Sequence, residues 1–162
     1  MQKIFITVVA SLLIVFSTFG ETESESSQIL SSTVSSGSNL DIDGNGRFDA
    51  LTDGLLVLRS MFGLTGAPLI SGVVAADAVY TNAEDIQSRI TGLGNLLDID
   101  NNGNVDALTD GLIILRYFFG LTGDTLIKDV VASDAQRLSA TDIESHMASL
   151  NSLNDYDFYL LE

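Results

Sequence analysis

The sequence predicts an all-α protein in which one helical unit occurs twice. Residues 40–96 align with residues 97–153 without a gap, and more than half of the aligned positions are identical. Within each unit, apolar residues recur at the three- and four-residue spacing of amphipathic helices, and there is little strand signal. These observations predict a tandem duplication with two helices per unit.

The composition limits the classes of partner. The chain has 162 residues, of which 46% are hydrophobic, enough for one ordinary domain or two small ones. Seven lysines and arginines stand against 22 aspartates and glutamates, giving a net charge of −15. We therefore expect no nucleic acid or anionic membrane as partner, because both would be repelled. The absence of cysteine excludes disulfides and thiolate metal sites.

The N-terminus has the pattern of a secretory signal peptide. Lys3 precedes an apolar run from Ile4 to Phe16, and small and polar residues follow. We expect residues 1–20 to be removed by cleavage near Gly20. The alternative is an uncleaved membrane anchor, but the run is shorter than the roughly 20 residues that span a bilayer. The prediction is a secreted or cell-surface protein without a membrane segment after cleavage.

A leader and a domain follow. Residues 21–39 are rich in serine and glutamate and have few bulky apolar side chains, so we expect a flexible leader. The duplicated domain spans residues 40–162. Its end, residues 154–162, carries two aspartates at the spacing that opens each unit, which indicates a degenerate third start. No glycine follows them, so we expect this segment to cover the helical core rather than bind metal.

The helices of each unit have recognisable ends. The first helix of the first unit should begin near Thr52 or Asp53 and stop at Gly63. A second helix should open after Asn82 and, in the second unit, after Ser139, because each is followed three positions later by an aspartate, as in a capping box. The segment between these helices is ambiguous between a short strand, a turn and a third helix.

Each unit opens with oxygen-bearing side chains at alternate positions around a glycine. Calcium takes six to eight oxygens, which an EF-hand loop supplies from positions 1, 3, 5, 7 and 9 and from a bidentate carboxylate at position 12. Both copies fit through position 9. The predicted ligands are Asp41, Asp43, Asn45, the backbone carbonyl oxygen of Arg47 and Asp49 in the first copy, and Asp98, Asp100, Asn102, the backbone carbonyl oxygen of Asn104 and Asp106 in the second. The alternative is an Asx-rich turn without metal, but two copies make two Ca²⁺ sites the stronger prediction.

The closing ligand departs from this pattern. Position 12 is Thr52 or Thr109, and the carboxylate comes one residue later, at Asp53 or Asp110. One alternative is a 13-residue loop closed by the aspartate. The other is a weaker site closed by water, in which the threonine or the aspartate caps the helix. We favour the first, because a threonine hydroxyl is neutral and monodentate.

Two further contacts are expected. Position 8 of each loop is apolar, Phe48 and Val105, as needed if the loops pair back to back through a short backbone bridge. Arg59 and Asp77 both recur in the second copy. We therefore expect an ion pair between them within each unit; the alternative is that they bind an anion or a partner.

The run from Asp41 to Arg59, repeated from Asp98 to Arg116, resembles the duplicated calcium-binding segment of type I dockerins. There, an EF-hand-like loop is followed by one helix, and the incoming helix is absent. The resemblance implies calcium ligation by the residues named above and docking to a protein such as a cohesin. The loop here is one residue longer, and loop positions 10 and 11, which usually carry cohesin recognition, are apolar.

The sequence has no repeated catalytic set and only one histidine, so we expect no enzyme. The predicted function is that of a secreted calcium-binding docking module whose fold is stabilised by two Ca²⁺ ions and whose partner is a protein, cohesin-like or a second copy. The alternative is a calcium-dependent structural or self-assembling protein of the cell surface or extracellular matrix.

Overall fold

Helices and loops alternate through residues 39–152, the part of the chain that the computed structural model describes. This part contains no strand, which confirms the all-α class. None of its helices is long and apolar enough to cross a bilayer. The predicted signal peptide, the leader up to residue 38 and the predicted third start at 154–162 lie outside the described residues.

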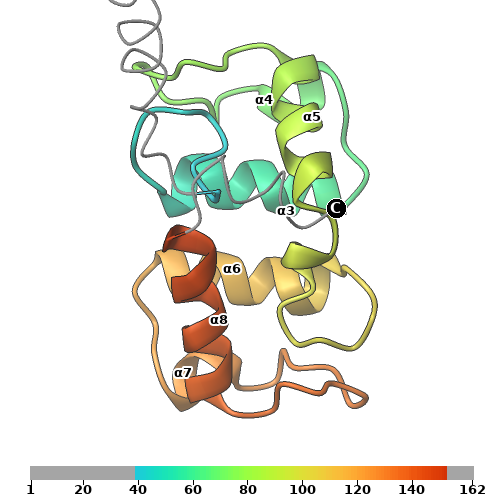
Figure 1. Ribbon diagram of the computed structural model, residues 1–162. Coiled ribbons are helices and arrows are strands. Elements are labelled where there is room, and N and C mark those ends of the chain that lie inside the picture. Colours follow the sequence, from blue (N-terminus) through green and yellow to red (C-terminus); the bar gives the residue numbers. More distant parts are fainter. Residues whose placement is uncertain (1–38, 153–162) are drawn as a thin grey trace, which may run out of the picture. The chain divides into compact units, whose positions relative to one another are not determined.

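The two units have the same order of elements (Figure 1). The elements of the first unit are a π-helical turn (Ala50–Gly54) that continues into α3 (Leu55–Met61), then α4 (Ala67–Ile70) and α5 (Ala83–Leu93). A 3₁₀ turn (Gly94–Leu97) leads to the second unit, which has a π-helical turn (Ala107–Gly111), α6 (Leu112–Phe118), α7 (Asp124–Ile127) and α8 (Ala140–Ser152). The ambiguous segment between the predicted helices thus contains a short helix, α4 or α7.

The first helix begins earlier than predicted, at Ala50 rather than near Thr52 or Asp53. The N–H of Gly54 donates to the carbonyl oxygen of Asp49 at 3.1 Å, a bond over five residues that widens the first turn. The second unit repeats this bond at 3.0 Å. A π turn holds one residue more than an α turn. The additional loop residue is therefore accommodated in the first turn of the helix.

The predicted starts of the later helices are confirmed. The side chain of Asn82 accepts a hydrogen bond from the N–H of Asp85 at 2.9 Å, and α5 begins directly after it. Ser139 Oγ accepts from the N–H of Asp142 at 3.1 Å at the start of α8. Both residues satisfy a donor that the first helical turn leaves unpaired.

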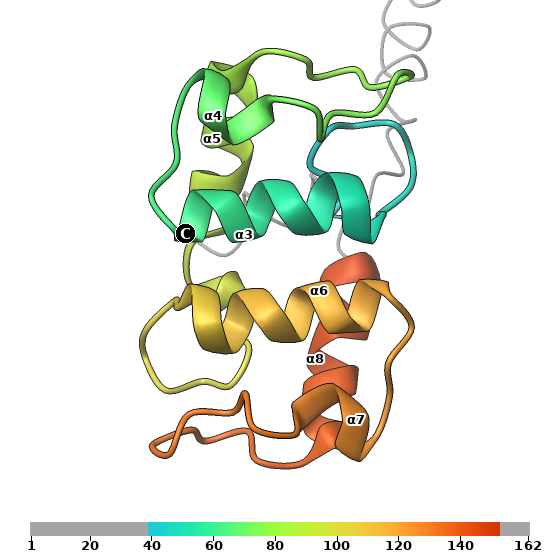
Figure 2. The same ribbon diagram turned by 180° about the vertical axis from the view of Figure 1, so that it is seen from behind.

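The two units contact each other through α3 and α6, which lie side by side and run in opposite directions (Figure 2). Two glycines permit this approach. A methyl group at Gly54 would lie 3.0 Å from Leu115 Cδ1, and one at Gly111 would lie 2.8 Å from Leu58 Cδ1. Leu56, Val57 and their counterparts in α6 are buried in a core shared by both units. The contact between the helices therefore joins the two units.

The loops do not pair through a backbone bridge, because residues 39–152 contain none. Phe48 and Val105 are instead 40% and 38% exposed, and the Phe48 ring packs against Phe118 with centroids 5.3 Å apart. The close contact of α3 with α6 brings these rings together across the units. The loops are thus positioned by the helices that follow them.

The predicted ion pair between Arg59 and Asp77 is wrong. Arg59 Nη1 donates instead to backbone carbonyl oxygens in and just after α4, those of Pro68, Leu69 and Ser71, at 3.3, 3.2 and 2.9 Å. Arg116 binds the equivalent oxygens of Thr125, Leu126 and Lys128. These arginines satisfy carbonyls that so short a helix leaves without partners, and they tie α4 to α3 and α7 to α6.

Candidate metal centres

Two groups of three aspartates could hold metal ions. In each group, one carboxylate oxygen per residue lies within 4.8 Å of the other two. The groups are Asp41, Asp43 and Asp53, and Asp98, Asp100 and Asp110. All six side chains are buried, and Asp43, Asp53, Asp100 and Asp110 are fully inaccessible. Within residues 39–152 no other group of this kind occurs.

Asp53 closes the first loop onto itself. Its Oδ1 accepts hydrogen bonds from the N–H groups of Ile42 and Asp43 at 2.7 and 3.1 Å. Its Oδ2 accepts from the N–H of Asp49 at 2.8 Å. One carboxylate at the π turn therefore fixes both the beginning and the end of the loop. Asp110 makes the same three contacts in the second unit, at 2.6, 3.2 and 2.8 Å.

Thr52 lies beside the aspartate triad without joining it. Its hydroxyl donates to Asp53 Oδ2 at 3.2 Å, as the Thr109 hydroxyl does to Asp110. The threonine therefore holds the aspartate that points into the group. Of the two residues considered for loop closure, the structure brings the aspartate to the other carboxylates.

Asp41 and Asp43 are oriented by backbone N–H groups. Asp41 accepts from Asn45 at 3.0 Å and from Gly46 at 2.8 Å, which bends the loop around its carboxylate. Asp43 Oδ2 accepts from the N–H of Ala75 at 2.9 Å. Ala75 follows α4 and forms a wall of the site that sequence reasoning missed. The sequence feature that could have indicated this contact is the Val-Val-Ala run, which recurs in the second unit. There, the N–H of Ala132 donates to Asp100 Oδ2 at 2.8 Å.

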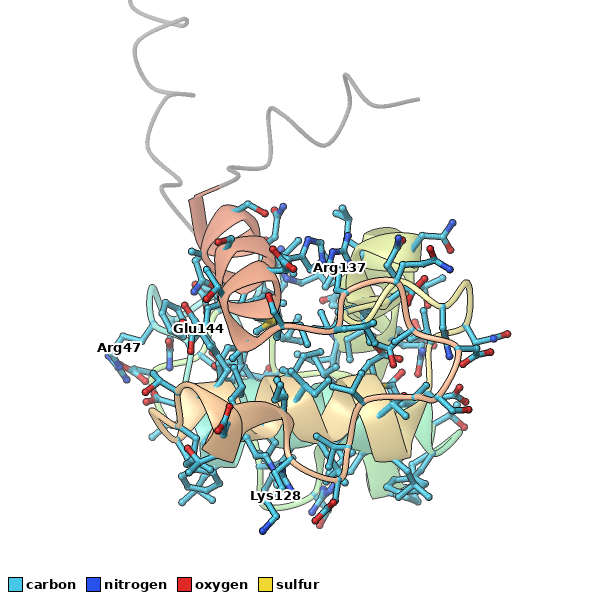
Figure 3. The ribbon with its side chains drawn as sticks, turned by 90° about the horizontal axis from the view of Figure 1, so that it is seen from below. Arg47, Lys128, Arg137 and Glu144 are labelled. Atoms are coloured by element: carbon cyan, nitrogen blue, oxygen red, sulfur yellow. The ribbon has the colours of Figure 1, made fainter. Side chains whose placement is uncertain are left out.

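The remaining predicted ligands lie at the rim of the first loop. Asn45 Oδ1 accepts from the N–H of Arg47 at 2.9 Å. The Asp49 side chain is 53% exposed and lies 3.6 Å from Arg47 Nε, outside the triad. Arg47 projects from the edge of the unit (Figure 3) and binds Asp77 through both terminal nitrogens, at 3.1 and 3.2 Å. The second loop has the same layout at Asn102, Asn104 and Asp106, but without an arginine.

An arginine covers the start of each loop. In the first unit, Arg89 donates to the carbonyl oxygens of Asp41 and Ile42 at 2.9 and 3.0 Å. Its guanidinium lies over the Tyr80 ring, 4.2 Å from the centroid. In the second unit, Arg137 (Figure 3) donates to the equivalent oxygens of Asp98 and Ile99, both at 2.9 Å. Sequence reasoning missed both contacts, because these arginines do not align with each other.

Burial makes the triads electrostatically costly without a cation. Desolvation raises the pKa of Asp53 from 3.8 to about 6, against the opposing effect of its backbone hydrogen bonds. The nearby charge of Asp43 raises it further. Burial also raises the pKa of Asp41 and of Asp110. A divalent cation would remove this penalty, because it neutralises charges that are withdrawn from water.

Comparison of the chain with protein-family models, with curated proteins and with solved structures found no match. The geometry of the two aspartate groups is therefore the basis for a functional assignment.

Proposed function

We propose that this chain is a secreted, non-catalytic calcium-binding docking module whose fold is stabilised by two Ca²⁺ ions. The observation that carries the proposal is the repeated buried triad, in which three carboxylates come together with no cationic side chain among them. Buried carboxylates are stable when they are paired or coordinate a metal. A bound divalent cation accounts for their burial.

The donor set favours calcium over other divalent ions. All donors are oxygens, and the sequence offers no thiolate and only one histidine. Asn45, the Arg47 carbonyl and Asp49 lie in the same loop as the triad and would complete a set of six or more oxygens, with Asp49 bound directly or through water. Magnesium is less suitable, because it prefers a tight octahedron with several waters.

The docking half of the proposal is supported by exposed apolar side chains in equivalent places. Leu51 and Leu108 are 64% and 65% exposed, and Phe62 and Phe119 are 55% and 56% exposed. An interaction surface needs exposed apolar side chains that lie together, and these four side chains are candidates for one. The proposed partner is a protein, either cohesin-like or a second copy of the chain.

The experiment is a calcium titration of the chain by calorimetry, combined with thermal unfolding in calcium and in chelator. We expect two bound ions per chain and a higher melting temperature in calcium, because a ligand that binds only the folded state stabilises it. A melting temperature that is the same in both buffers would contradict the proposal. Light scattering in calcium then separates the two kinds of partner: a monomer favours docking to another protein, and a polymer favours self-assembly.

A further inference from the structure

Asn45–Gly46 and Asn102–Gly103 are the only Asn-Gly pairs in the sequence, and both stand at the same place in the two loops. Every other asparagine is followed by a residue with a side chain. Asparagine is chemically labile in proteins. It is most so before glycine, because glycine has no side chain to shield its backbone nitrogen from the neighbouring amide.

We infer that Asn45 and Asn102 are latent deamidation sites that the folded loop protects and the opened loop exposes. In the reaction, the backbone nitrogen of the glycine attacks Cγ of the asparagine and loses its proton. The Cγ–Nδ2 bond breaks, ammonia leaves, and a succinimide ring remains. Water then adds to either ring carbonyl carbon, and the ring opens to aspartate or to isoaspartate.

The first loop holds both reacting groups away from this path. The N–H of Gly46 donates to Asp41 Oδ2 at 2.8 Å, which fixes the orientation of the glycine nitrogen. The Asn45 side chain is held at both ends: Oδ1 accepts from the N–H of Arg47 at 2.9 Å, and Nδ2 donates to Asp77 at 3.4 Å. Attack requires the glycine nitrogen to lose its proton and turn toward Cγ, which breaks these bonds.

The second loop makes the same three contacts, but it lacks the arginine that reinforces them in the first loop. Gly103 donates to Asp98 at 2.9 Å, and the Asn102 side chain is held by the N–H of Asn104 at 2.9 Å and by Asp134 at 3.2 Å. In the first loop Asp77 is itself fixed by Arg47. Asn104 stands in place of that arginine in the second loop, so Asn102 is the less protected site.

Deamidation would change the loop irreversibly. Aspartate at this position adds a negative charge beside three buried carboxylates, and isoaspartate adds one carbon to the backbone of the turn. The protection rests on the hydrogen bonds described above. Only its dependence on metal rests on the proposed function.

The test is a time course of the full chain at neutral pH in three buffers, which contain calcium chloride, EDTA or concentrated urea. Mass analysis of proteolytic peptides measures amide loss at Asn45 and Asn102, and Asn101 and Asn104 serve as controls in the same loop. In calcium we expect loss at least about tenfold slower than in urea, an opening free energy of about 1.4 kcal/mol or more. In EDTA the rate should approach that in urea.

A substitution tests the difference between the loops. Asn102 should react faster than Asn45 in calcium, where both loops are closed, and Arg47→Asn should bring the Asn45 rate up to that of Asn102, because it gives the first loop the residue of the second.

The outcomes separate the inference from the proposed function. Amide loss as fast in calcium as in urea, or no loss even in urea, would overturn the inference. Equally slow loss in calcium and in EDTA, with fast loss in urea, would support protection by the fold and count against a role for metal in ordering the loops.

Discussion

In the first unit an arginine reaches the loop from helix α5, whereas in the second unit an arginine reaches the equivalent oxygens from the chain that precedes α8. Arg137 aligns with Tyr80, and His146 aligns with Arg89. The ring of Tyr80 supports Arg89, while His146 Nε2 lies 3.1 Å from the carbonyl oxygen of Leu96. The same pair of carbonyls is thus bound from two different positions in the repeat.

The contacts that α5 and α8 make outside the loops also differ between the two units. Glu144 (Figure 3) accepts from the N–H of Gly123 at 2.7 Å, whereas its counterpart Gln87 donates to Ser60 Oγ at 3.2 Å. The contacts of the six triad carboxylates, in contrast, are the same within a few tenths of an ångström. The carboxylate geometry is therefore kept in both units, while the arginine that binds the start of the loop comes from either of two positions in the repeat.

The largest effect should come from removing the residue that closes each triad. Asp53→Asn and Asp110→Asn should each abolish one of the two proposed calcium sites, because a neutral amide replaces a central carboxylate. We expect the affinity of the altered site to fall more than about 100-fold, beyond the 10- to 100-fold typical of outer-shell residues.

Calorimetric stoichiometry measures this effect, and the matched controls are Thr52→Val and Thr109→Val, which leave the triad intact. If Thr52→Val weakened the first site more than Asp53→Asn, the loop would close at its twelfth residue. Unequal effects of the two aspartate changes would break the equivalence of the triads.

A smaller effect should come from the arginines. Arg89→His should lower the free energy of unfolding by about 1–3 kcal/mol, because two carbonyl oxygens lose charge-assisted hydrogen bonds. Urea unfolding in chelator measures the loss. Adding Tyr80→Arg gives the first unit the arrangement of the second and should restore stability. Failure of this exchange would show that the two supports are not interchangeable.

The pH dependence should be moderate and should change sign with calcium. The raised pKa of Asp53, about 6 in the folded chain against 3.8 when unperturbed, means that the metal-free folded state binds more protons between these values. Its stability should therefore rise as pH falls from 7 to 5, whereas calcium affinity should fall because protons compete for the carboxylates. Melting curves in chelator measure the first trend, and it should flatten in Asp53→Asn.

The smallest effect is expected at the rim. Arg47→Asn removes an exposed ion pair with Asp77 and should leave the midpoint of urea unfolding almost unchanged, because solvent screens exposed pairs. Urea unfolding in calcium measures it. A larger loss would mean that the first loop depends on its rim more than the second, which has no such pair.

Much of the fold could be predicted because its signals are local. The caps at Asn82 and Ser139 are determined by short stretches of sequence, and the duplication is visible as a gapless alignment of residues 40–96 with 97–153. The aspartate that the structure brings to each triad is also visible in a short stretch of sequence. The sequence does not decide the short helix α4, because four residues are too few to show a period. The partners of Arg59 cannot be predicted from the sequence, because they are backbone carbonyls, which no residue pattern reveals.

The arginines over the loops could not be found for a different reason. Reading a duplicated sequence by aligned positions finds only contacts that both copies make with the same residue. Arg89 and Arg137 do not occupy aligned positions, although their guanidinium groups bind equivalent carbonyl oxygens. Only the spatial arrangement shows that they have one role.

The contact between α3 and α6 has the symmetry of a homodimer. Gly54 meets Leu115, Gly111 meets Leu58, and these four residues are two pairs of aligned positions. Each unit therefore presents the same surface to the other, as the subunits of a two-fold symmetric dimer do. In evolutionary terms, the described part of the chain has the design of two like subunits fused through Gly94–Leu97, each of which carries one buried aspartate triad.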